Sequence, residues 1–173
     1  LKPYYIINRD GIKIAIIGMI TPAIPNWLNE KLWEGMSFQE MKECALYWTT
    51  YLKKQENPDI IIGLFHSGAE GGIITDEYEE DASLRIAKEV PGFDLILYGH
   101  DHKKHIETIK NKDGHDVLCM DPSSNAYFIC DAEIDVTINN GQIINKQIKG
   151  SLKDVRNLPV DTAFMEYFKD EID

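Results

Sequence analysis

Three short apolar runs, separated by helix-like segments, constrain the fold of this chain more than any other feature. They cover residues 12–17, 59–65 and 93–98. Runs that are apolar at consecutive positions are typical of strands buried on both faces of a parallel sheet. Between the first two runs, apolar side chains recur at steps of three and four, as on one face of a helix: Phe38, Met41, Ala45, Trp48 and Leu52. The pattern predicts a β-α-β-α-β chain of the α/β class.

Capping and stop signals predict where the two helices begin and end. Residues 37–40 (SFQE) have the capping-box pattern, so we expect the first helix to begin there and to end at Asn57-Pro58. The second helix is predicted over 79–90, before Pro91-Gly92. The acidic run 76–81 is interpreted as the solvated start of this helix, where the helix dipole favours negative charge.

The remaining segments predict antiparallel strands. Residues 3–8 and 12–17 flank the turn residues Arg9-Asp10-Gly11, which indicates an N-terminal hairpin. Shorter runs with more alternation follow from about residue 105, at 105–109, 117–120, 127–138 and 142–149. Asn139-Asn140-Gly141 is typical of a hairpin turn. We therefore expect a β meander and a second, antiparallel sheet after the α/β part.

Size and composition exclude several classes of protein. The 173 residues correspond to about one domain. The net charge of −11 repels phosphate backbones, so we expect no nucleic-acid partner. No apolar run approaches the ~20 residues of a membrane span, and no signal peptide is visible, which leaves the localisation open. Because the sequence does not begin with Met, we expect it to be processed or a piece of a longer chain.

Histidines follow two of the predicted parallel strands directly. The carboxyl ends of such strands meet at one edge of the sheet, where ligands bind in α/β proteins. His66 follows the second run, and His100 and His102 follow the third. Neutral imidazole is a common metal ligand, so these three residues are the predicted metal site. Asp101 is interpreted either as a carboxylate that orients one of these histidines or as a solvated loop residue.

Residues 64–68 (LFHSG) and 98–102 (YGHDH) resemble the calcineurin-like metallophosphoesterases, specifically the branch of 5′-nucleotidases and 2′,3′-cyclic-nucleotide phosphodiesterases. The resemblance extends over about residues 2–140. It implies part of a four-layer αββα sandwich with two divalent metal ions (Mn, Zn or Fe), and a location that is often periplasmic or at the cell surface. By this resemblance His66 and His100 hold one metal and His102 the other. It also implies hydrolysis of a phosphate ester, with nucleotides as the expected substrates, by a hydroxide that the two metals activate.

The family's first half carries three further motifs, D-x-H, G-D and G-N-H-[D/E], and we find none of them. Asp101-His102 lacks the first spacing, no Gly-Asp pair occurs, and no Asn precedes a His. We therefore interpret residues 1–173 as the second half of a catalytic domain, with no catalytic residue assigned. We expect this chain alone to be inactive. The exposed sheet edge should pair with the missing N-terminal half or with a second copy.

Two alternatives stay open. The three histidines and one further ligand could hold a single structural zinc in a non-catalytic binding module. The chain could instead be a metal-free α/β interaction domain in which these histidines are ordinary loop residues. Metal stoichiometry separates the three hypotheses, because only a structural site should bind one ion tightly and unfold when a chelator removes it.

Overall fold

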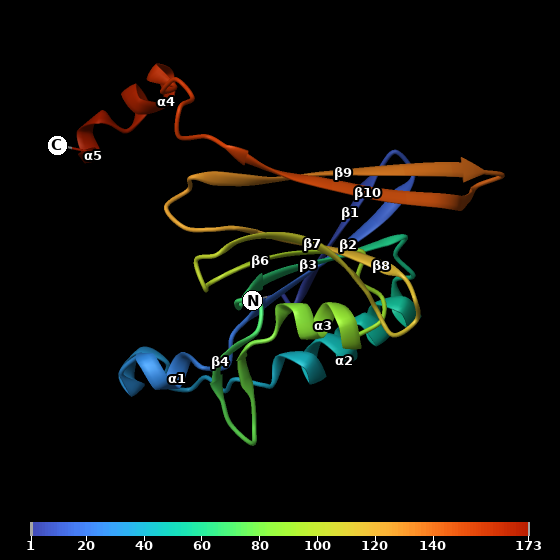
Figure 1. Ribbon diagram of the computed structural model, residues 1–173, viewed down its shortest axis with the longest axis horizontal. Coiled ribbons are helices and arrows are strands. Elements are labelled where there is room, and N and C mark those ends of the chain that lie inside the picture. Colours follow the sequence, from blue (N-terminus) through green and yellow to red (C-terminus); the bar gives the residue numbers. More distant parts are fainter. Residues whose placement is uncertain (1, 173) are drawn as a thin grey trace.

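A six-stranded mixed sheet forms the centre of the molecule. The computed structural model describes residues 2–172, and Figure 1 shows the sheet between two other layers. The strand order is β1-β2-β3-β6-β8-β7. The strands are β1 (Tyr4–Arg9), β2 (Ile12–Ile20), β3 (Ile60–His66), β6 (Leu95–Gly99), β8 (Asp116–Pro122) and β7 (Lys104–Lys110). The four inner strands are parallel, and β1 and β7 are antiparallel edges, which confirms the predicted hairpin and the three parallel runs.

Two helices, α2 (Met41–Gln55) and α3 (Ser83–Glu89), cover one face of this sheet (Figure 1). The main core lies between them and the strands. Its side chains include Ile17, Phe65 and Ile96 from the sheet and Leu52 and Ile86 from the helices. Each of these is almost completely buried, so the amphipathic stripe predicted for the first helix does face the sheet.

Helix α2 begins one turn later than the sequence predicted. Glu40 is its N-cap, and the Glu40 carboxylate accepts a hydrogen bond from the Glu43 amide at 2.7 Å. Ser37 is exposed and lies outside the helix, so its assignment as the cap was wrong. A carboxylate placed directly before the first turn satisfies a free amide and complements the helix dipole, which replaces the role given to Ser37.

The acidic run 76–81 does not begin a helix, and this prediction was also wrong. Residues Glu79–Asp81 form β5, which pairs antiparallel with β4 (Gly71–Ile74). Helix α3 starts only at Ser83. Long-range hydrogen bonds hold β5 against the loop that follows β3, as described below, and these outweigh the local preference for a helix start.

A long two-stranded ribbon forms the second β layer. It consists of β9 (Phe128–Asn139) and β10 (Gln142–Asp154), with the turn where the sequence predicted it, and it crosses the sheet face opposite the helices (Figure 1). Of the four strands expected after residue 105, β7 and β8 extend the central sheet and these two form the second sheet. The short α1 (Ile24–Trp27) and a 3-10 turn (Glu30–Leu32) follow β2, whereas α4 (Thr162–Tyr167) and α5 (Lys169–Ile172) end the described chain.

The ribbon packs on β6 and β8 and leaves the other half of the same sheet face uncovered. Leu95 and Met120 lie beneath it. A Cβ atom on Gly150 would lie 2.6 Å from the Met120 sulfur, so the backbone of the ribbon lies very close to the side chains of β8. On β1 and β3, alternation places Tyr5 and Leu64 on this face, and they are 61% and 54% exposed. None of the helices within residues 2–172 is long and apolar enough to cross a membrane.

Candidate metal centre

The carboxyl ends of β3 and β6 bring two of the predicted ligands together. His66 is the last residue of β3 and pairs with Gly99, the last residue of β6. His100 follows at once, and the ring centroids of His66 and His100 are 5.0 Å apart. His102 lies two residues further along the same loop and is exposed, as is His66. The predicted histidines thus share one edge of the sheet.

The backbone of this loop adopts uncommon conformations. His100 has φ +126° and His102 has φ +60°, both in the region that favours glycine. Such conformations cost free energy in a residue with a side chain, and they cluster at functional sites. The two imidazoles are therefore held at this edge against the local preference of the backbone.

The electrostatic surroundings of His66 favour its neutral form. Desolvation of the ring lowers the pKa of His66, and the neighbouring His100 and His102 lower it further. The neutral imidazole is the form that binds metal ions, because protons and metals compete for the same lone pair. His66 and His100 therefore form a pair of imidazoles that suits a transition-metal ion, whereas the ligand atoms of all three histidines do not lie within 4.8 Å of one another.

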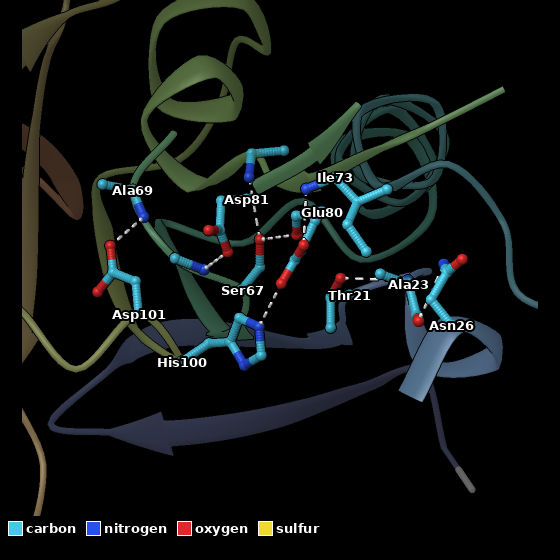
Figure 2. Close-up of polar contacts among 12 residues, drawn as sticks. Thr21, Ala23, Asn26, Ser67, Ala69, Ile73, Glu80, Asp81, His100 and Asp101 are labelled. Atoms are coloured by element: carbon cyan, nitrogen blue, oxygen red, sulfur yellow. Dashed lines mark hydrogen bonds and ion pairs between the residues drawn. The ribbon is translucent and has the colours of Figure 1, made fainter. Parts of the chain in front are cut away.

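Two carboxylates that the sequence analysis did not select lie beside His100. Within residues 2–172, one group of three or more potential ligand atoms lies within 4.8 Å, and it consists of Glu80, Asp81 and His100. Glu80 Oε1 is 3.0 Å from His100 Nε2 (Figure 2). The β4–β5 hairpin carries both carboxylates to the edge. The sequence analysis predicted a helix over residues 76–81. No local pattern indicated that Glu80 would lie beside His100, which is twenty positions later in the chain.

Ser67 fastens this hairpin to the end of β3. Its hydroxyl donates to the Glu80 carbonyl at 2.9 Å and accepts from the Ala82 amide at 3.0 Å (Figure 2). The Ser83 hydroxyl in turn donates to the Ser67 carbonyl at 2.8 Å. Ser67 is completely buried, so these bonds are shielded from water. The residue after His66 thus fixes the strand that carries Glu80.

Asp101 connects the two histidine loops through the backbone. Its carboxylate accepts hydrogen bonds from the amides of Ala69 at 3.0 Å and Lys103 at 3.1 Å, and its side chain is 6% exposed. Burial alone would raise the pKa of Asp101, but these amide donors outweigh it and the pKa is lowered. The Asp101 side chain is therefore buried in the loop, and its described hydrogen bonds go to the backbone rather than to a histidine ring.

A second buried carboxyl group, Asp121, lies at the end of β8 and was not anticipated. Burial, aided by the neighbouring Asp101, raises the pKa of Asp121 to about 7. One of its oxygens accepts from the Ser123 amide at 2.8 Å, and the other is buried without a hydrogen-bond partner in the described part of the chain. Burial beside the Asp101 carboxylate therefore favours the protonated form of Asp121.

One match to the D-x-H spacing escaped the sequence analysis. Asp113-Gly114-His115 has that pattern, so the statement that the motif is absent was wrong. These residues form the turn between β7 and β8. Because β8 runs parallel to β6 and begins at Asp116, this turn lies at the opposite edge of the sheet from His100. It therefore cannot supply a ligand to the histidine edge.

Comparison with known proteins finds that the chain is similar to part of several phosphoesterases. No family model matches it. It is 33% identical over 105 residues to a 5′-nucleotidase of Vibrio cholerae. This alignment covers 57% of this chain and 18% of the relative. It is 29% identical over 127 residues to a 2′,3′-cyclic-nucleotide 2′-phosphodiesterase/3′-nucleotidase of Yersinia enterocolitica, which covers 65% and 19%. The chain thus spans about a fifth of the length of these curated relatives.

Solved structures show the same fold. The calcineurin-like phosphoesterase YfkN from Bacillus subtilis superimposes with a TM-score of 0.74 at 22% identity, over 98% of this chain and 57% of that one. A 5′-nucleotidase precursor from Thermus thermophilus superimposes with a TM-score of 0.68 at 20% identity, over 98% and 34%. The chain is therefore similar in sequence to part of the 5′-nucleotidases and 2′,3′-cyclic-nucleotide phosphodiesterases, and it has the fold of part of a calcineurin-like phosphoesterase.

Proposed function

We propose that this chain supplies part of the metal site of an enzyme that hydrolyses phosphate esters, with nucleotides as the substrate class. The observation that carries the proposal is the juxtaposition of His66 and His100 at the ligand-binding edge of the sheet, with His102 on the same loop. The relatives named as nucleotidases and phosphodiesterases give the reaction class. An acidic chain of net charge −11 would repel such substrates unless a cation compensates, which is consistent with a metal site.

In this proposal His66 and His100 hold one divalent metal ion and His102 contributes to a second. The donor set fits, because the rings of His66 and His100 are adjacent and their surroundings favour neutral imidazole at His66. When bound, divalent ions stabilise the charge that develops on a phosphoryl group and lower the pKa of water. The protein's own contribution is to fix the imidazoles, through the loops that Ser67 and Asp101 hold in place.

The remaining ligands would come from a segment outside these 173 residues. No Gly-Asp pair and no Asn-His pair occurs in the sequence, and its D-x-H match lies at the wrong edge. The uncovered sheet face around Tyr5 and Leu64 offers a surface on which that segment, or a second copy of the chain, could pack. Three imidazoles cannot complete two metal sites, so we expect the chain alone to bind metal weakly and to turn over little substrate.

Metal titration and a phosphatase assay on the same preparation test this proposal. We expect weak binding of Mn²⁺ or Zn²⁺, weakened further by His66→Ala and His100→Ala, and little hydrolysis of a nucleotide by the 173-residue chain. His115→Ala is the matched control, because it removes a histidine from the opposite edge and should leave binding unchanged. An affinity for Mn²⁺ or Zn²⁺ that is the same in the wild type and in the His66 and His100 variants would contradict the proposed site. One tight ion whose removal by chelator unfolds the protein would favour a structural zinc instead.

A further inference from the structure

His100 has two ring nitrogens, and one of them, Nε2, lies at hydrogen-bond distance from a carboxylate. A neutral imidazole has one N–H donor and one lone-pair acceptor, and the bond made by one nitrogen decides the state of the other. Nε2 lies 3.0 Å from Glu80 Oε1, and the two side chains are 20% and 12% exposed. An ionised carboxylate only accepts hydrogen bonds, so Nε2 must be the donor here. The lone pair of the neutral ring is then on Nδ1.

Glu80 is fixed from the opposite side as well. Its second oxygen, Oε2, accepts a hydrogen bond from the Ile73 amide on the paired strand β4 at 2.7 Å. A Cβ atom on Gly72 would lie 2.6 Å from this oxygen, so the glycine leaves room for the carboxylate to approach the backbone. Both oxygens of Glu80 thus face N–H donors, one from the backbone and one from His100.

The same contacts argue against a metal bound directly by Glu80, Asp81 and His100. Asp81 Oδ1 accepts a hydrogen bond from the Gly68 amide at 2.6 Å, and Glu80 is engaged as just described. Each carboxylate thus already accepts a hydrogen bond from a protein donor. These acidic groups therefore hold the two loops together and orient the histidine.

Aromatic neighbours restrict the His100 ring further. The Trp27 ring of α1 lies 5.1 Å from it between centroids, and the His66 ring lies 5.0 Å from it. Ring packing of this kind limits rotation about the side-chain torsions. The hydrogen bond from Nε2 then decides which ring nitrogen has the free lone pair.

We propose that Glu80 is a positioning residue that holds His100 as the Nε2–H tautomer and leaves Nδ1 free as the metal ligand. The proposal rests on the proposed metal site, which it deepens by naming the ligand atom and the group that selects it. Carboxylates that accept a hydrogen bond from a metal-binding histidine orient the ring and raise its basicity, and their loss typically weakens metal binding about 10- to 100-fold.

Glu80→Gln provides a sharp test because it keeps the shape and changes the hydrogen-bond pattern. Glutamine has one acceptor and one donor group, whereas Glu80 presents two acceptors. The Ile73 amide can only donate, so it should form its hydrogen bond with the glutamine oxygen. The NH₂ group of the glutamine then faces His100. Nε2 must then accept, and the tautomer of His100 should invert to Nδ1–H. Glu77→Gln, at the exposed tip of the same hairpin, is the matched control.

The tautomer can be read from the ring ¹⁵N chemical shifts of the metal-free chain at a pH where the imidazole is neutral. We expect Nε2–H in the wild type and in Glu77→Gln, and Nδ1–H in Glu80→Gln. Calorimetric titration with Zn²⁺ should show affinity about 10- to 100-fold lower in Glu80→Gln and unchanged in Glu77→Gln. The amide resonances of Gly68 and Ile73 report whether the hairpin is still folded in each variant.

Two outcomes would overturn the positioning role, and a third concerns the metal site alone. An Nδ1–H tautomer in the wild type, or no change of tautomer in a folded Glu80→Gln variant, would refute the proposed role of Glu80 whatever the metal data show. If the wild type binds no Zn²⁺ while the tautomer inverts as expected, the proposed metal function fails and the orientation of His100 by Glu80 is supported.

Discussion

The face of the central sheet that lies opposite the helices has two different surroundings. Over β6 and β8 the β9–β10 ribbon covers it, and Leu95 and Met120 are 2% and 0% exposed. Over β1 and β3 the same face is open, and Tyr5 and Leu64 remain largely exposed. Strands of similar apolar character thus differ in burial because a second layer is present over one half and absent over the other. Packing of that layer, and not the strand sequence, determines which residues contribute to stability.

The largest expected effect is on the covered half. Met120→Ala should lower the free energy of unfolding by about 2–5 kcal/mol, because it leaves a cavity between the sheet and the ribbon. Leu64→Ala, on the open half, should cost about 1 kcal/mol or less, because its side chain is already half in water. Urea unfolding of both variants measures the difference. Equal losses would show that the open face is buried in solution, by a second copy or by another segment.

A pH-dependent difference should come from Asp121, at the edge of the covered half. Its pKa is raised to about 7 in the folded chain, so the folded state favours the protonated form. The stability contributed by Asp121 is therefore complete below its ordinary pKa near 4 and is lost as the pH rises through about 7. Relative to Asp121→Asn, the wild type should lose about 1–3 kcal/mol between about pH 4 and pH 8. Urea unfolding at a series of pH values measures this difference. If the stabilities of the wild type and Asp121→Asn change with pH in the same way, the raised pKa of Asp121 is contradicted.

Two glycines sharpen the comparison at a smaller scale. Gly150→Ala should cost about 1–2 kcal/mol, because the new methyl group meets Met120 and Leu118 beneath the ribbon. Gly18 lies on the open half, where an added Cβ atom meets nothing within 4 Å. Gly18→Ala should therefore be neutral or stabilise the strand by up to about 1 kcal/mol. Thermal unfolding of both variants checks the sign, and a destabilised Gly18→Ala would indicate that something packs on the open face.

The smallest expected change in stability belongs to Leu64→Glu, which should alter self-association instead. If two copies pair through the open face, a charge at its centre is left without a partner in the interface. We expect the wild type to associate at high concentration and the variant to remain monomeric, with a free energy of unfolding within about 0.5 kcal/mol of the wild-type monomer. Light scattering over a concentration series measures this, and identical masses for both proteins would exclude this face as the contact.

Local sequence patterns were sufficient to predict the parallel strands and the edge that carries His66 and His100. A continuous apolar run and the carboxyl end of its strand are both properties of a few neighbouring residues. Glu80 was missed because its position depends on β4–β5 pairing and on the hydroxyl of Ser67, which lies thirteen residues away. The start of α2 was misplaced because Ser37 satisfies the local rules for a cap, whereas the observed cap, Glu40, is a residue type that these rules do not favour. Asp101 could not be assigned from sequence, because its partners are backbone amides on two loops.

The left-handed backbone at His100 and His102 has a consequence for how this sequence can vary. At such positions glycine is the residue that the backbone conformation alone would select, and it would relieve strain of about 1–3 kcal/mol per site. A screen that rewards heat resistance alone should therefore recover glycine at both positions and discard the imidazoles. Under the proposed function, metal binding requires histidine at both positions. Stability and activity therefore favour different residues at these two sites.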